Sequence, residues 1–126
     1  MKTLRFLQEM NLVRANRRIS RDKMGVPFVQ GATAEAVLYG AGYASAQDRL
    51  FQIEFLRRTA NGSLAELLGP SVLEMDKEAR IDGFTDSEMR AQIDALPEEH
   101  KKLFKAMVKG ANAYIAKAIE EPKVYM

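Results

Sequence analysis

The sequence of 126 residues contains no cysteine, no tryptophan and a single histidine, His100. Without cysteine the chain has no disulfide bond, no zinc–thiolate centre and no cysteine nucleophile. One histidine cannot supply a multi-histidine metal site, and a Ser-His-Asp triad would depend on His100 alone. We therefore expect neither a metal site nor a familiar histidine-based active site in this chain.

Strong net charge and long apolar runs are also missing. The chain has 19 lysines and arginines and 17 aspartates and glutamates. The resulting net charge of +2 is too small to indicate a nucleic-acid or membrane partner. A basic cluster lies near the start, at Arg14, Arg17, Arg18 and Arg21, but no aromatic residues are interleaved with it. The apolar stretch Leu4–Leu12 is interrupted by polar residues, so we recognise neither a membrane span nor a signal peptide.

Apolar residues nevertheless make up 47% of the chain, enough to form a core, and no repeat or interdomain linker divides it. Residues 1–126 are therefore interpreted as one segment. Two short strands, Arg17–Asp22 and Val26–Gln30, predict a β-hairpin within residues 15–31. Gly25 suits the turn, and Pro27 favours an edge position because it cannot donate a ladder hydrogen bond.

Helical signals fill residues 33–121. A long helix is predicted from a cap at Thr33 to a stop at Asn61 and Gly62, followed by three short helices and a last helix between Pro97 and Pro122. The last helix carries an apolar stripe that we expect to be buried, opposite a lysine-rich face. The short helices have capping-box spacings at Ser63/Glu66, Ser71/Glu74 and Thr85/Glu88. The fold class is α+β, mostly helical with one N-terminal β-hairpin.

The long helix contains an unusual run of small residues between Tyr39 and Ala46. Each interior glycine costs about 1 kcal/mol relative to alanine, so Gly40 and Gly42 indicate close approach of another backbone. A flexible break between two helices is the alternative. One stripe continues through the run and favours the close-packed helix: Leu38, Gly42, Ser45, Arg49, Ile53 and Leu56.

Arg49 on this stripe would be partly buried, which requires a charged partner. We expect a structural ion network rather than an acid–base pair, because arginines adjoin the carboxylates; its members are Asp22, Asp48, Arg49, Glu54, Arg58, Asp76 and Arg80. Ser63 and Ser71 are better explained as helix caps than as nucleophiles, and His100 as a solvated residue. No catalytic residue is expected in this chain, and the sequence does not identify substrate-binding residues.

Several short strings of residues occur in a fixed order and together cover about Arg17 to Ile119. The strings are Arg21–Pro27, Tyr39–Tyr43, Ala46–Glu54, Arg57-Arg58, Gly62, Leu64–Gly69, Asp76 with Arg80, and Gly110–Ile115. In identity and order they resemble the start of the small (alpha) subunit of the penicillin acylase (penicillin amidase) family. The sequence departs from the family pattern at Phe28 and Ser45, and it stops at Met126, before the family's small subunit usually ends.

The resemblance implies an N-terminal nucleophile hydrolase with an αββα fold when complete. In that family autoproteolytic processing yields a heterodimer, and the first residue of the large (beta) subunit, usually serine, attacks an amide carbonyl. Its free α-amine, with an ordinary pKa of about 7.7–8.0, can act as the base. Penicillins, cephalosporin-type side chains and acyl-homoserine lactones are the implied substrates, and the large subunit is the implied partner.

The same resemblance implies no cofactor in this chain and allows a structural calcium in the complete enzyme. Family members are often periplasmic or secreted, which would place a targeting segment outside residues 1–126. The chain alone is expected to be inactive. The competing interpretation is a stand-alone, truncated helical module that binds a partner without catalysis.

Overall fold

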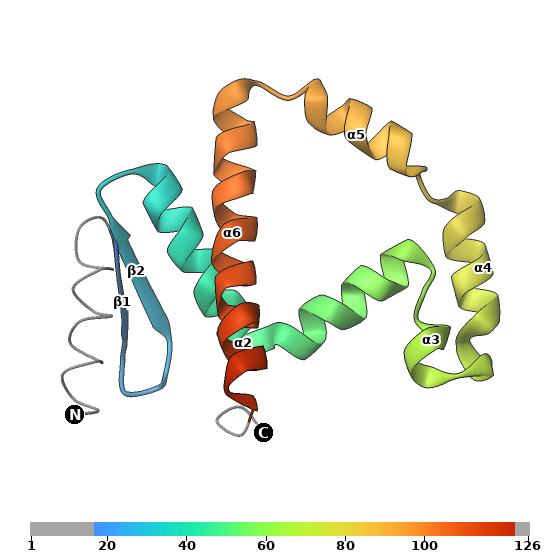
Figure 1. The fold of residues 1–126 in the computed structure, drawn as a ribbon, viewed down its shortest axis with the longest axis horizontal. Helices are drawn as coiled ribbons and strands as arrows, with labels where there is room; N and C mark the ends of the chain where they lie inside the picture. The colour runs from blue at the N-terminus through green and yellow to red at the C-terminus, as the bar shows by residue number, and fades with distance from the viewer. Residues whose placement is uncertain (1–16, 123–126) are drawn as a thin grey trace. The chain divides into compact units, whose positions relative to one another are not determined.

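The computed structural model describes residues 17–122 (Figure 1). The predictions about Leu4–Leu12 and Arg14 lie outside these residues. The described chain forms two compact units: residues up to Asp48 together with those from Glu98 make unit 1, and Arg49–Pro97 make unit 2. The long helix α2, Ala34–Asn61, contributes residues to both units.

The predicted β-hairpin is confirmed in unit 1. Strand β1, Arg17–Arg21, pairs antiparallel with β2, Pro27–Gly31, with Ile19 opposite Val29. The Asp22 carboxylate closes the turn by accepting hydrogen bonds from the backbone N–H groups of Met24 and Val26, both at 2.9 Å. Gly25 takes a φ of +83°, a conformation that glycine adopts at little cost.

The first half of α2 packs against both the hairpin and helix α6, Glu98–Glu120 (Figure 1). A methyl group placed on Gly40 would lie 2.5 Å from the Val29 side chain of the hairpin. On α6, Gly110 is equally confined, because a methyl group there would meet the backbone of Tyr39 and Tyr43. The close backbone approach predicted from the glycines is thus confirmed where α2 meets α6, whereas Gly40 lies against a side chain of the hairpin.

The contact between α2 and α6 is reciprocal. A methyl group on Gly42 would strike the backbone carbonyl of Met107 on α6, just as one on Gly110 would strike that of Tyr39 on α2. Next to this crossing, the rings of Tyr43 and Tyr114 meet edge to face, with centroids 5.5 Å apart. Two glycines therefore let the helices touch, and an aromatic pair fixes their contact.

Unit 2 consists of the second part of α2 followed by short helices: α3 (Ala65–Leu68), the 3₁₀ helix η1 (Pro70–Val72), α4 (Leu73–Asp82) and α5 (Asp86–Asp94). Gly62 ends α2 with a φ of +60°, as expected from its position. The Leu64 side chain is fully buried, and Asp76 is the buried charged residue of the described chain, with 3% of its surface exposed.

The prediction of one straight stripe along α2 is wrong. Arg49 has non-helical backbone angles, φ −139° and ψ 28°, and α2 kinks there. This residue breaks the regular rotation of about 100° per residue, so the positions after it no longer continue the earlier face. Ile53 and Leu56 are exposed as a result, and so is Arg49, which we expected to be partly buried.

Two of the three predicted capping boxes are also wrong. Thr85 and Glu88 form the box at the start of α5, and Thr33 caps α2 by accepting a hydrogen bond from the Ala36 N–H at 3.2 Å. Ser63 and Ser71 cap no helix, because α3 and α4 begin after Leu64 and Val72 without a side-chain cap.

The last helix has the predicted extent but not the predicted burial. Gly110 and Tyr114 are buried, whereas several members of the expected buried stripe are exposed: Phe104, Met107, Val108 and Ile119. The contacts of α2 with α6 at Gly42 and Gly110 leave these side chains uncovered within unit 1. None of the described helices has the length and apolar character needed to cross a bilayer.

Candidate functional site

Arg21 links the hairpin to α2 in unit 1. Its guanidinium donates two hydrogen bonds to the Asp48 carboxylate, at 2.7 and 3.0 Å, and one to the Gln47 side chain at 2.8 Å. It also donates to the backbone carbonyl of Gly25 at 2.7 Å. Such a bidentate arginine–carboxylate pair is geometrically specific, so the turn is held in a fixed place against the helix.

A second polar cluster surrounds Glu54 in unit 2. Arg57 donates two hydrogen bonds to the Glu54 carboxylate, at 2.7 and 2.8 Å, and Arg58 donates one at 2.7 Å. These bonds, first from Arg57 and then from Arg58, lower the pKa of Glu54 from 4.5 to about 2. A carboxylate with so low a pKa stays ionised near neutral pH and is a poor proton carrier, so its role is structural.

Arg58 extends this cluster to the loop after α2. It also donates to the Glu66 carboxylate at 2.9 Å and to the Ser63 carbonyl at 3.3 Å. A single side chain therefore joins helix α2, the following loop and helix α3.

The buried carboxylate of Asp76 organises the same loop from the other side. It accepts hydrogen bonds from the backbone N–H groups of Leu64, at 2.9 Å, and Ala65, at 2.7 Å. These groups open α3 and would otherwise have no partner within it. Arg80, one turn further along α4, donates to the Gly62 carbonyl at 2.7 Å. Asp76 and Arg80 thus hold the loop without forming an ion pair with each other in the described residues.

The seven residues expected to form one ion network therefore lie in separate places. Glu54 and Arg58 are brought together, Asp48 pairs with Arg21, and Asp22 bonds to its own turn. Arg49 has no ion-pair partner among residues 17–122. The expected network left out Arg21 and Arg57, and Glu66 was expected in a capping box with Ser63 rather than in contact with Arg58. The hairpin register and the i, i+3 spacing to Glu54 were the available signals for the two arginines.

Neither a catalytic constellation nor a metal site occurs in the part of the chain that the structure describes. His100 lies exposed in the first turn of α6 and shares no hydrogen bond with a described serine. Residues 17–122 contain no group of three or more acidic, histidine or cysteine side chains that could hold a metal ion. The structural calcium that the resemblance allows belongs to the complete enzyme and stays an expectation.

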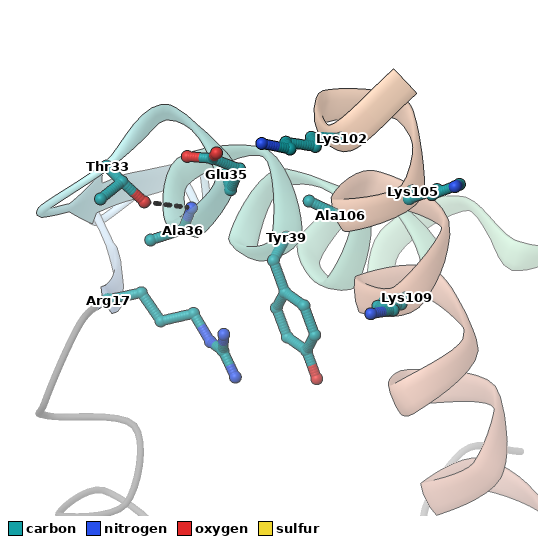
Figure 2. A pocket seen from close by; sticks show the side chains of 9 residues that line it. All are labelled: Arg17, Thr33, Glu35, Ala36, Tyr39, Lys102, Lys105, Ala106 and Lys109. Atoms are coloured by element: carbon teal, nitrogen blue, oxygen red, sulfur yellow. Dashed lines mark hydrogen bonds between the residues drawn. The ribbon is translucent and has the colours of Figure 1, made fainter. Parts of the chain in front are cut away.

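The structure also reveals a groove that sequence reasoning missed. A cavity of about 400 Å³ lies in unit 1 between the start of β1, the first turns of α2 and the middle of α6 (Figure 2). Its lining residues are Arg17, Thr33, Glu35, Ala36, Tyr39, Lys102, Lys105, Ala106 and Lys109. Four of them are cationic and one is acidic. The lysines were predicted to lie on the solvated face of the last helix. That they lie near α2 could not be predicted, because this depends on how α2 and α6 cross.

Comparisons with known proteins agree on one family. The family profile described as Penicillin amidase matches residues 16–125. Penicillin G acylase of Escherichia coli is 38% identical over 109 residues, and penicillin acylase 2 proenzyme of Pseudomonas sp. (strain SE83) is 40% identical over the same length. These alignments cover 86% of this chain but only 13% and 14% of the two relatives.

A second group of relatives carries another name. The acyl-homoserine lactone acylase QuiP of Pseudomonas aeruginosa is 34% identical over 97 residues, which cover 77% of this chain and 11% of that protein. The chain thus spans about one-seventh or less of the curated relatives it matches.

The fold agrees with the sequence comparisons. A chain of the thermostable penicillin G acylase from Alcaligenes faecalis superposes with a TM-score of 0.77 at 35% identity, over 85% of this chain and 56% of that chain. The penicillin acylase is an N-terminal nucleophile hydrolase, as the resemblance implied. The agreement of family profile, curated relatives and fold over most of the described residues shows that the chain belongs to the penicillin amidase family.

Proposed function

We propose that this chain is the N-terminal portion of the small subunit of an N-terminal nucleophile amidohydrolase. In this proposal a large subunit supplies the nucleophile and its α-amine base, while this chain forms part of the surrounding scaffold. The complete enzyme hydrolyses the amide bond of an N-acylated small molecule. Support comes from relatives named as acylases of penicillin and of acyl-homoserine lactones, two classes of molecule with an acyl group on an amide nitrogen.

The observation that carries the proposal is the amount of uncovered apolar surface. Among the described residues, five apolar side chains are buried, whereas eighteen large ones are exposed. On α6 the exposed fractions reach 61% at Phe104 and 73% at Ile119. Burial of one such side chain stabilises by roughly 1.5–3 kcal/mol, so a chain that leaves this many in water is expected to be covered by other polypeptide.

Unit 2 has the same property as unit 1. Ile81 on α4 is 80% exposed, and Phe51 on α2 is 70% exposed. Both are too large and too apolar to favour solvent, and they lie on helices whose polar clusters are otherwise well satisfied. Each unit therefore offers apolar surface of its own to a partner.

The proposal is tested by producing the chain alone and together with the large subunit. The chain alone should release no acid from a chromogenic N-acyl substrate, and the assembled, processed enzyme should release it. Circular dichroism of the isolated chain controls for loss of helix. A panel of penicillin-type amides and acyl-homoserine lactones then identifies the substrate class.

Two results would contradict the proposal. Turnover by the isolated chain would show that it carries its own nucleophile. A chain that remains monomeric, folds cooperatively and does not associate with a large subunit would favour the stand-alone helical module.

A further inference from the structure

The groove in unit 1 has an apolar floor and a cationic rim (Figure 2). Ala36, Ala106 and the ring of Tyr39 form the floor, while Lys102, Lys105 and Lys109 line it from α6. The Arg17 guanidinium stacks over the Tyr39 ring, 3.5 Å from its centroid. This stacking fixes one positive charge at the mouth of the groove.

One carboxylate outside the lining of the groove acts on its lysines, because Lys101 first, and then Lys105 and Lys102, lower the pKa of Glu98. Lys101 pairs with Glu98, and Lys77 pairs with Glu74, but no ion pair within residues 17–122 involves Lys102, Lys105 or Lys109. The one acidic residue that lines the groove, Glu35, leaves three positive charges in excess. Like charges gathered around a concave surface attract an anion more strongly than the same charges dispersed over a convex one.

The arrangement of the charges is linear. The lysines lie three and four residues apart on one helix, so together they span about 10 Å along its axis. A single phosphate group is much shorter than this span. An extended polypeptide has its alternate side chains about 7 Å apart, so two carboxylates of one segment can reach separate lysines.

Figure 2 shows that the lysine side chains are not all directed alike. Lys102 extends toward Glu35 and Lys109 toward Tyr39, whereas the ammonium group of Lys105 turns away from the groove. Lysine has a flexible stem, so Lys105 can turn toward an anion without backbone movement.

We propose that this groove binds an acidic, extended segment of the large subunit, with at least two carboxylates along the lysines of α6. This inference rests on the proposed function and specifies one part of its interface. The apolar floor accommodates the segment's backbone and an intervening apolar side chain, and the lysines give the contact its charge selectivity.

The test compares two variants, each of which lacks three positive charges, in assembly with the large subunit. The first replaces the groove lysines in K102Q/K105Q/K109Q. The matched control, R18Q/K23Q/R90Q, removes the same number of charges from exposed positions outside the groove. We expect the groove variant to raise the Kd by about 10-fold, the control to change it by less than about 2-fold, and the difference to shrink at high salt.

Carbodiimide cross-linking supplies a direct readout, since it joins ammonium to carboxylate groups in contact. Mass spectrometry should find Lys102, Lys105 or Lys109 joined to aspartate or glutamate of the large subunit. Equal affinities of the two variants, or cross-links only from lysines outside the groove, would overturn the inference while leaving the proposed assembly intact.

A peptide assay separates failure of this inference from failure of the proposed function. A fluorescein-labelled peptide of six glutamates should bind the unaltered chain, and it should bind the groove variant more weakly. A labelled peptide of six glutamines should bind the unaltered chain more weakly than the glutamate peptide does. If no large subunit associates, the proposed function fails, and the inferred occupant fails with it. Displacement of the peptide by equimolar inorganic phosphate would also overturn the assignment, in favour of a phosphate ligand.

Discussion

Replacement of Gly42 by alanine should destabilise unit 1, because the new methyl group would strike backbone atoms. It would contact the Met107 carbonyl, with the carbonyl carbon at 2.9 Å and the Ala111 nitrogen at 3.2 Å. Backbone atoms cannot turn aside as a side-chain end can, so α2 and α6 would have to separate. Overpacking of this kind costs about 1–3 kcal/mol, against a gain in helix propensity of about 1 kcal/mol.

Because the new methyl group meets backbone atoms, we expect an overpacking cost at the top of this range, about 3 kcal/mol, which leaves a net loss of about 2 kcal/mol in the free energy of unfolding. For a small domain this corresponds to a fall in Tm of about 8–16 °C. Thermal unfolding followed by circular dichroism measures it. The matched control is N112A, which makes a comparable gain in helix propensity at an exposed position of α6.

The reciprocal contact of Gly42 and Gly110 also predicts how the effects of the two substitutions combine. Once G42A has separated the helices, G110A at the same crossing should cost less than it does alone, so the double variant should fall short of the sum. A Gly42 variant as stable as the control, or strictly additive losses in the double variant, would refute the reasoning from close packing.

Four other variants test the polar clusters and helix caps of unit 2. Substitution of Asp76 by asparagine replaces one of two accepting oxygens by an amide donor, so urea unfolding should show a loss of about 1–3 kcal/mol; no change would contradict its capping role. The lowered pKa of Glu54, about 2, means that its stabilising effect is complete above pH 4.5 and disappears as the pH falls through 2. E54Q should therefore flatten the dependence of stability on pH in this window, and an unaltered profile would count against the arginine pairing. T85A should cost about 0.5–2 kcal/mol in thermal unfolding, whereas S71A should cost almost nothing because its hydroxyl caps no helix; equal losses would contradict this assignment.

Local signals were sufficient to predict most of the elements. Thr33, Gly62 and Thr85 act on backbone groups within a few residues, so their effects can be read from neighbouring sequence. The glycines of the long helix also predicted a close approach, since their cost in helix propensity requires compensation. They could not identify the partner as α6.

The sequence-based predictions failed where a contact is made by residues far apart in the chain instead of by sequence neighbours. Asp76 takes over the role expected of Ser63 as a cap, although it lies more than ten residues further along the chain. The basic groove likewise exists only because α2 and α6 meet. The kink at Arg49 could not be predicted, because neither proline nor glycine, the usual local causes of a kink, lies beside it.

The exposed stripe of α6 illustrates a different limit. Periodicity predicted that residues such as Phe104 and Ile119 are buried, whereas both are exposed in this chain. It carries no information on whether the covering atoms belong to the same chain. The expected core was therefore too large for this chain alone.

The two parts of unit 1 are separated in sequence by the whole of unit 2, which has a consequence during synthesis. The hairpin and the first half of α2 leave the ribosome as neighbours, linked through Arg21 and Asp48. The surface that they present to α6, which includes Gly42, stays uncovered until roughly 70 more residues have been made, or about 4–14 s at ordinary rates of translation. The nascent chain therefore passes through a stage in which the hairpin and the first half of α2 have been made but α6 has not. A chaperone or a slow-translating stretch at that stage would affect the yield of folded protein.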